Sequence, residues 1–102
     1  MSRVDKILEM IQSGGKDSFL QHALALEYIK IGQYQDAMEQ FVDLLSSNPD
    51  YVGSYYHLAK LYERLNELEQ AISTYEKGME VAKKLKDQHA YNELLAAKDD
   101  LI

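Results

Sequence analysis

The sequence predicts an all-α protein, an α-α superhelix of about six helices built from a repeated helical hairpin. One observation is a pattern of residues that occurs twice. Matching positions in the two copies are separated by a constant number of residues, the same as from Leu24 to Leu58, and we call this separation the repeat interval. Another is the residue type at these positions, because small and aromatic residues at helical spacing are typical of closely packed helix pairs. The repeated positions are Leu24, Ala25, Tyr28, Ala37 and Phe41 in the first copy, and Leu58, Ala59, Tyr62, Ala71 and Tyr75 in the second.

An amphipathic helix is predicted over residues 3–13, where apolar residues recur every three or four positions. Gly14-Gly15 is expected to end it, because glycine favours helix C-termini. The apolar positions of this helix lie one repeat interval before those of the second helix of the first hairpin, so it is interpreted as a degenerate second helix: Val4, Ile7, Leu8, Met10 and Ile11.

The first repeat is predicted over residues 18–50 and the second over 51–85, within a single domain that spans residues 1–102. Asp17 or Ser18 is expected to cap a helix that runs to residue 31, before Gly32. Its partner is predicted over 34–46, followed by a tight turn at Pro49. The second repeat is expected to contain helices over 51–65 and 68–85, joined by a turn at Asn66.

The last helix is predicted to start at Asp87 or Gln88 and to serve as a C-terminal cap over residues 87–102. The repeat interval does not carry the pattern into it, since one further step from Leu58, Ala59 and Tyr62 reaches Asn92, Glu93 and Ala96. We therefore expect this helix to be slightly out of register.

Composition limits the classes of partner. The chain has 17 acidic residues against 11 Lys and Arg, a formal net charge of −6, which argues against nucleic acid and anionic membranes as general partners. It has no cysteine, which fits a reducing compartment, and no apolar run of the roughly 18 residues that a membrane span needs. We expect a cytoplasmic, acidic protein.

With these elements placed, the sequence resembles the tetratricopeptide repeat (TPR) family, as a small stand-alone protein. The family pattern of Leu-small-x-x-Tyr, then Ala-x-x-x-aromatic, then a closing proline fits the first copy, with Pro49 last. The second copy has Tyr55 where the first has Gln21, and Lys83 replaces the closing proline. The resemblance implies a non-catalytic scaffold or adaptor that binds a peptide or partner protein in a concave groove.

The resemblance also implies which residues line that groove, formed by the first helix of each pair at residues 18–31, 51–65 and 87–99. We expect the partner-binding residues to be His22, Lys30, Tyr56, His57, Lys60, Arg64 and Tyr91. Lys30, Arg64 and Lys98 are separated by the repeat interval, so they could grip an acidic segment or a C-terminal carboxylate. The alternative is that they only stabilise helix C-termini.

No catalytic, metal or cofactor site is predicted. His89 and Glu93 are one helical turn apart, but a catalytic metal needs about three protein ligands. Tyr56-x-x-x-Lys60 has the spacing of a dehydrogenase pair without the glycine-rich fingerprint that such enzymes carry. A second functional hypothesis is homo-oligomerisation through the terminal helices, using Val4, Leu8 and Ile11 or Tyr91 and Leu95.

Overall fold

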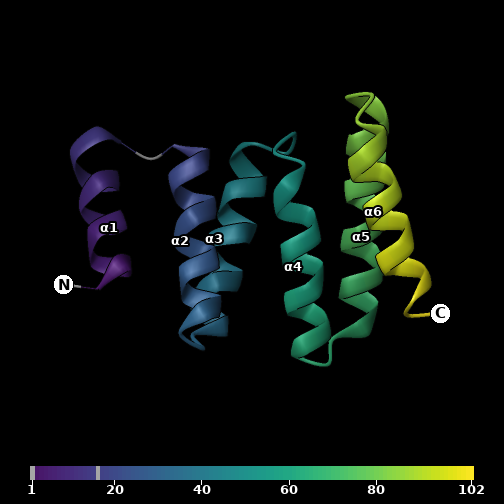
Figure 1. The fold of residues 1–102 in the computed structure, drawn as a ribbon, viewed down its shortest axis with the longest axis horizontal. Helices are drawn as coiled ribbons and strands as arrows, with labels where there is room; N and C mark the ends of the chain where they lie inside the picture. Colours follow the sequence, from purple (N-terminus) through teal and green to yellow (C-terminus); the bar gives the residue numbers. More distant parts are fainter. Residues whose placement is uncertain (1, 16) are drawn as a thin grey trace. The chain divides into compact units, whose positions relative to one another are not determined.

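The computed structural model describes residues 2–15 and 17–102, which form six α-helices and no strand (Figure 1). The all-α prediction is confirmed, and each helix boundary lies within three residues of the predicted one. The fourth helix begins at Gly53 instead of Tyr51, and the helix of the cap predicted over 87–102 ends at Asp99. The helices are α1 (Arg3–Gly14), α2 (Ser18–Lys30), α3 (Tyr34–Ser47), α4 (Gly53–Arg64), α5 (Leu68–Lys84) and α6 (Gln88–Asp99).

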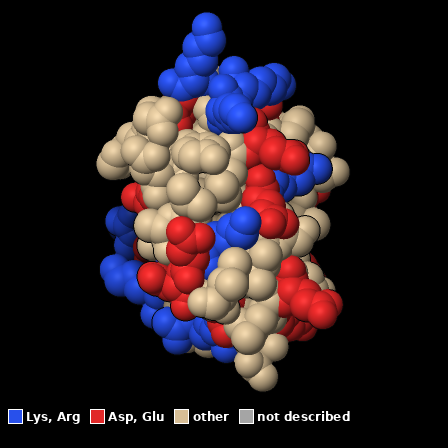
Figure 2. All heavy atoms as spheres, turned by 90° about the vertical axis from the view of Figure 1, so that its right-hand side faces the viewer, with Lys and Arg blue, Asp and Glu red and all other residues tan. Residues whose placement is uncertain are grey.

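The chain divides into two compact units, Met1–Asn48 (unit 1) and Pro49–Ile102 (unit 2), and each is described by itself. In unit 1, α2 packs against both α1 and α3. In unit 2, α5 packs against both α4 and α6. Figure 2 looks onto the α5 and α6 side of unit 2, where charged side chains of both signs surround uncharged surface. The prediction of a single domain stays a prediction.

Local signals in the sequence set the helix ends. The Asp17 carboxylate accepts a hydrogen bond from the Leu20 amide at 2.8 Å, so Asp17 is the N-cap of α2. Gly32 and Asn66 follow α2 and α4 with φ angles of 81° and 61°, a left-handed conformation that glycine and asparagine adopt at little cost. Lys86 also has a positive φ, 59°, which its residue type did not predict.

The motif residues form the cores of the two units. In unit 1, Leu24 and Leu44 have no more than 1% of their surface exposed, and Phe41 has none. The alanines at the repeated positions are all fully buried, as expected for sites where a larger side chain would separate the helices: Ala25, Ala37, Ala59 and Ala71. The residues that recur at the repeat interval therefore include the core residues of both units.

One pair of core positions differs between the units. Unit 1 has Gln21 in α2 and Leu44 in α3, whereas unit 2 has Tyr55 in α4 and Gly78 in α5, each one repeat interval later. A Cβ atom added to Gly78 would lie 2.7 Å from the Tyr55 Cβ and 3.0 Å from the Leu94 Cδ1, so only glycine fits there. In unit 2 the first helix therefore supplies the large side chain, Tyr55, and the second helix has no side chain at the matching position, whereas in unit 1 the second helix supplies Leu44.

In unit 1, the residue at the position of Tyr55 is Gln21, a buried polar side chain. Its side chain is 2% exposed, and a buried amide without partners would be destabilising. The Nε2 atom of Gln21 donates to the Asp43 Oδ2 at 2.8 Å and to the Gln40 Oε1 at 3.3 Å, both on α3. In unit 1, α2 is therefore joined to α3 by hydrogen bonds of Gln21, whereas in unit 2 the Tyr55 ring packs between α4 and α5.

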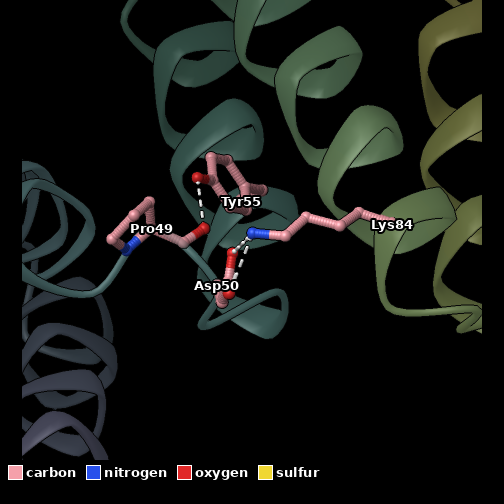
Figure 3. A network of polar contacts seen from close by, with 4 residues as sticks. All are labelled: Pro49, Asp50, Tyr55 and Lys84. Carbon is pink, nitrogen blue, oxygen red and sulfur yellow. Dashed lines mark hydrogen bonds and ion pairs between the residues drawn. The ribbon is translucent and has the colours of Figure 1, made fainter.

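The turn before α4 is held by side chains from two helices (Figure 3). The Tyr55 hydroxyl donates to the Pro49 carbonyl at 2.6 Å. From the last turn of α5, the Lys84 Nζ reaches both carboxylate oxygens of Asp50, at 3.1 and 3.2 Å. Val52, the N-cap residue of α4, makes no side-chain capping bond, so these contacts fix the start of the helix instead.

The register of α6 is shifted by two residues. Tyr91 stands three residues before buried Leu94, just as Tyr55 stands three residues before buried Leu58. The sequence separation between Tyr55 and Tyr91 is two residues longer than the repeat interval. The segment between them also differs, since α5 has 17 residues and α3 has 14, while the loop that follows is residues 85–87 after α5 and residues 48–52 after α3. The repeat interval therefore does not identify equivalent positions in α6.

Candidate partner-binding surface

Three predicted binding residues lie together on α4 of unit 2: Tyr56, His57 and Lys60, which we call the α4 patch. The rings of Tyr56 and His57 meet edge to face, with centroids 5.6 Å apart and an interplanar angle of 89°. The Lys60 Nζ lies 5.6 Å from the centre of the Tyr56 ring, within the range of a cation–π contact. All three side chains are partly exposed, so the patch offers flat aromatic surface beside a positive charge.

Contacts with Tyr75 and Glu63 hold the α4 patch in place. The Tyr75 ring, fully buried, meets the Tyr56 ring at a centroid distance of 6.4 Å. Its hydroxyl donates to the Glu63 Oε2, and the Lys60 Nζ lies 3.6 Å from the same oxygen. Glu63 therefore partly neutralises Lys60 and links the surface to the core.

The environment of Tyr75 keeps its hydroxyl protonated. Burial raises the pKa of Tyr75 far above its ordinary value, and the hydrogen bond to Glu63 and the Glu63 charge raise it further. The same hydroxyl is thus a permanent donor across the ordinary pH range.

We expect Tyr75→Phe to lower the free energy of unfolding by about 1–3 kcal/mol at neutral pH, because Glu63 loses its donor. The raised pKa of Tyr75 contributes stability that is complete below the pKa of an unfolded tyrosine, about 10, and is lost as the pH rises above it. Between about pH 9 and 11 the wild type should therefore lose more stability than the variant. Urea unfolding at several pH values measures both effects, and parallel pH profiles would contradict this role of Tyr75.

His57 faces α6 across unit 2. Partial burial lowers the pKa of His57, and the carboxylate of Glu93 on α6 opposes that shift. His57 and Glu93 are as far apart in the sequence as Tyr55 and Tyr91. With the shifted register of α6, Glu93 is therefore the residue equivalent to His57. The imidazole is therefore neutral at neutral pH and contributes a ring to the α4 patch.

The predicted cationic residues occupy similar places in their own helices. Lys30, Arg64 and Lys98 each lie in the last turn of a helix, α2, α4 and α6 respectively. A positive charge there is stabilised by the helix dipole. The Lys98 Nζ also pairs with the Glu76 Oε2 at 3.0 Å. The helix ends thus account for all three positions, and a role in gripping a carboxylate stays a prediction.

His22 belongs to unit 1, and Tyr91 lies apart from the α4 patch within unit 2. In unit 1, the His22 ring meets the Phe41 ring edge to face at a centroid distance of 5.7 Å. In unit 2, Tyr91 lines two neighbouring hollows of about 410 and 450 Å³ between α5 and α6, and no α4 residue lines either. We call these linings the α5–α6 surface: Glu76, Met79, Glu80, Ala82, Lys83, Lys86, Asp87, Gln88, Tyr91 and Lys98.

The sequence predicted Tyr91 in the groove or in a contact between copies, but not beside α5, because the repeat interval pairs Tyr91 with His57. The spacing Tyr-x-x-Leu, shared by Tyr55 and Tyr91, was the signal that could have found it. Within residues 2–15 and 17–102, the structure contains no cluster of three potential metal ligands among His, Cys, Asp and Glu. None of the helices described is both long and apolar enough to cross a membrane.

Paired helices that recur at a constant interval define an α-helical repeat protein. Comparison with known proteins gives the family, since the profile of the tetratricopeptide repeat matches residues 28–98. The chain belongs to the tetratricopeptide repeat family. Members of this family generally mediate protein–protein interactions.

Similar proteins support the same assignment. A TPR repeat-containing protein of Methanocaldococcus jannaschii is 34% identical over 58 residues, which cover 57% of this chain but only 10% of that protein's length. The crystal structure of a tetratricopeptide repeat domain protein from Salinibacter ruber is 44% identical with a TM-score of 0.80, covering 84% of this chain and 96% of the other. PcrH in complex with the chaperone binding region of PopB has a TM-score of 0.79 at 16% identity, covering 97% of this chain and 77% of PcrH, a likeness of fold alone.

Proposed function

We propose that this protein is a non-catalytic interaction module that binds a peptide or partner protein through the α4 patch. The observation that carries the proposal is the packing of Tyr56, His57 and Lys60 into one partly exposed group. Aromatic side chains held in fixed positions supply most of the energy at many interfaces, because little conformational entropy is lost on binding. Fully buried Tyr75 and partly buried Glu63 provide that support here.

The charges of the patch favour a ligand with a carboxylate. Lys60 is shared between the Tyr56 ring and Glu63, and Arg64 follows one turn later in the same helix. A carboxylate of the ligand would add a second acceptor for Lys60 and complete a charge-assisted contact. We therefore propose an acidic side chain or a C-terminal carboxylate as the group recognised. The complex of PcrH with a segment of PopB, on a similar fold, supports peptide binding as the mode.

A display library of random peptides with free C-termini, selected on the wild-type protein, would test this proposal. We expect selected peptides to be enriched in acidic residues or to need the free carboxylate. The double variant Lys60→Glu/Arg64→Glu should weaken their binding by at least about tenfold in calorimetry, because both cations near the ligand are reversed.

The matched control is Lys6→Glu/Lys77→Glu, which makes the same change of net charge at exposed positions of α1 and α5. This control should bind the selected peptides as the wild type does, and both double variants should keep the helical circular dichroism signal. Equal binding by the two double variants would exclude the α4 patch as the binding site.

A further inference from the structure

The α5–α6 surface contains an aromatic side chain that unit 2 leaves partly exposed. Tyr55 is 3% exposed because it contacts α5, the helix that follows its own, at Gly78. Tyr91 stands at the equivalent position in α6, three residues before buried Leu94, but it is less buried than Tyr55. Tyr91 is partly exposed and lines both hollows, as Lys83 does, and Met79 lines one of them.

The charges of this surface are ordered along α5. Glu76 and Glu80 lie within the helix, Lys83 lies in its last turn, and Lys86 lies in the turn that follows. In Figure 2, basic atoms gather at the top, where the turn between α5 and α6 lies, and again at the lower left, and acidic atoms lie through the middle and at the lower right. Glu76 is already paired with Lys98, at 3.0 Å.

Three charges around Tyr91 are left uncompensated. Glu80, Lys83 and Lys86 are exposed and form no ion pair with another residue in the part of the chain that the structure describes. Glu80 and Lys83 lie about one helical turn apart on α5 and line the same hollow as Tyr91, so a half turn about an axis between them exchanges an acidic and a basic position. A two-fold axis near Tyr91 would place Glu80 of each copy against Lys83 of the other.

We propose that the α5–α6 surface is the interface of a two-fold symmetric homodimer. Each Tyr91 ring is covered by the other copy, and two equivalent contacts between Glu80 and Lys83 set the register. The occupant is thus a second copy of this chain. The interface lies apart from the α4 patch and does not depend on the proposed function.

Sedimentation velocity from low to high micromolar concentration tests the dimer. We expect the wild type to dimerise, and Glu80→Lys and Lys83→Glu each to weaken dimerisation by at least about tenfold, because each change places like charges together twice. An equimolar mixture of the two variants should dimerise again with nearly wild-type affinity, since both contacts in the mixed dimer then join opposite charges. Such recovery is specific to a two-fold contact between these residues.

Lys77→Glu is the matched control, because Lys77 is exposed on the same helix and lines neither hollow. It should leave dimerisation unchanged, and circular dichroism should show that every variant keeps its helices. A wild type that stays monomeric throughout would overturn the proposal. A dimer that both single variants leave intact, or single variants that do not recover on mixing, would overturn it as well, and the latter would indicate an interface of different geometry.

Discussion

Replacing Phe41 by alanine is expected to lower the free energy of unfolding of unit 1 by about 3–5 kcal/mol. The side chain is fully buried and contacts the His22 ring, so its removal leaves a cavity between α2 and α3. A loss of this size is comparable with the whole stability of many small domains. Urea unfolding measures the loss, and hydrogen exchange should show it in the amides of α2 and α3.

Val42→Ala serves as the control for Phe41→Ala. Val42 is the next residue of α3 but is 47% exposed, so the change should alter stability by no more than about 0.5 kcal/mol. If the two variants unfolded at the same urea concentration, the assignment of Phe41 to the core of unit 1 would be wrong.

Gly78→Ala is expected to destabilise unit 2 by about 1–3 kcal/mol, although alanine is the better helix former by about 1 kcal/mol. The added Cβ would lie 2.7 Å from the Tyr55 Cβ, an atom next to the backbone that cannot turn away. Helices α4 and α5 must then move apart. Thermal and urea unfolding should both show the loss.

Gly53→Ala is the corresponding control in α4. Nothing lies within 4 Å of a Cβ added at Gly53, so this change should be neutral or slightly stabilising. Equal stability of the two alanine variants would show that the close contact between Gly78 and Tyr55 does not limit the packing of unit 2.

The sequence was sufficient to predict the six helices and most of the buried residues, because the signals involved are local. Gly32 and Asn66 at the turns and Asp17 at an N-cap depend on nearby backbone geometry alone. The alanines and aromatics that recur at the repeat interval, such as Ala37 and Phe41, report the packing of two neighbouring helices.

The placement of the candidate site residues depended on tertiary structure and was harder to predict. The α4 patch could be expected, since Tyr56 and Lys60 are one turn apart in one helix. The support from Tyr75 and Glu63 could not, because it joins side chains of different helices. The two-residue shift of α6 moves Tyr91 beside α5, and a fixed repeat length conceals such a shift.

The exchange of large and small residues between the two hairpins also bears on how this chain can be recombined. If α3 were transplanted into the place of α5, Leu44 would stand where Gly78 accommodates Tyr55. The reverse transplant would remove the leucine and put Tyr75 and Gly78 beside Gln21, whose amide needs the partners that α3 supplies. A single helix of this protein therefore cannot be exchanged between the two hairpins without loss of the contacts that pair it with its neighbour.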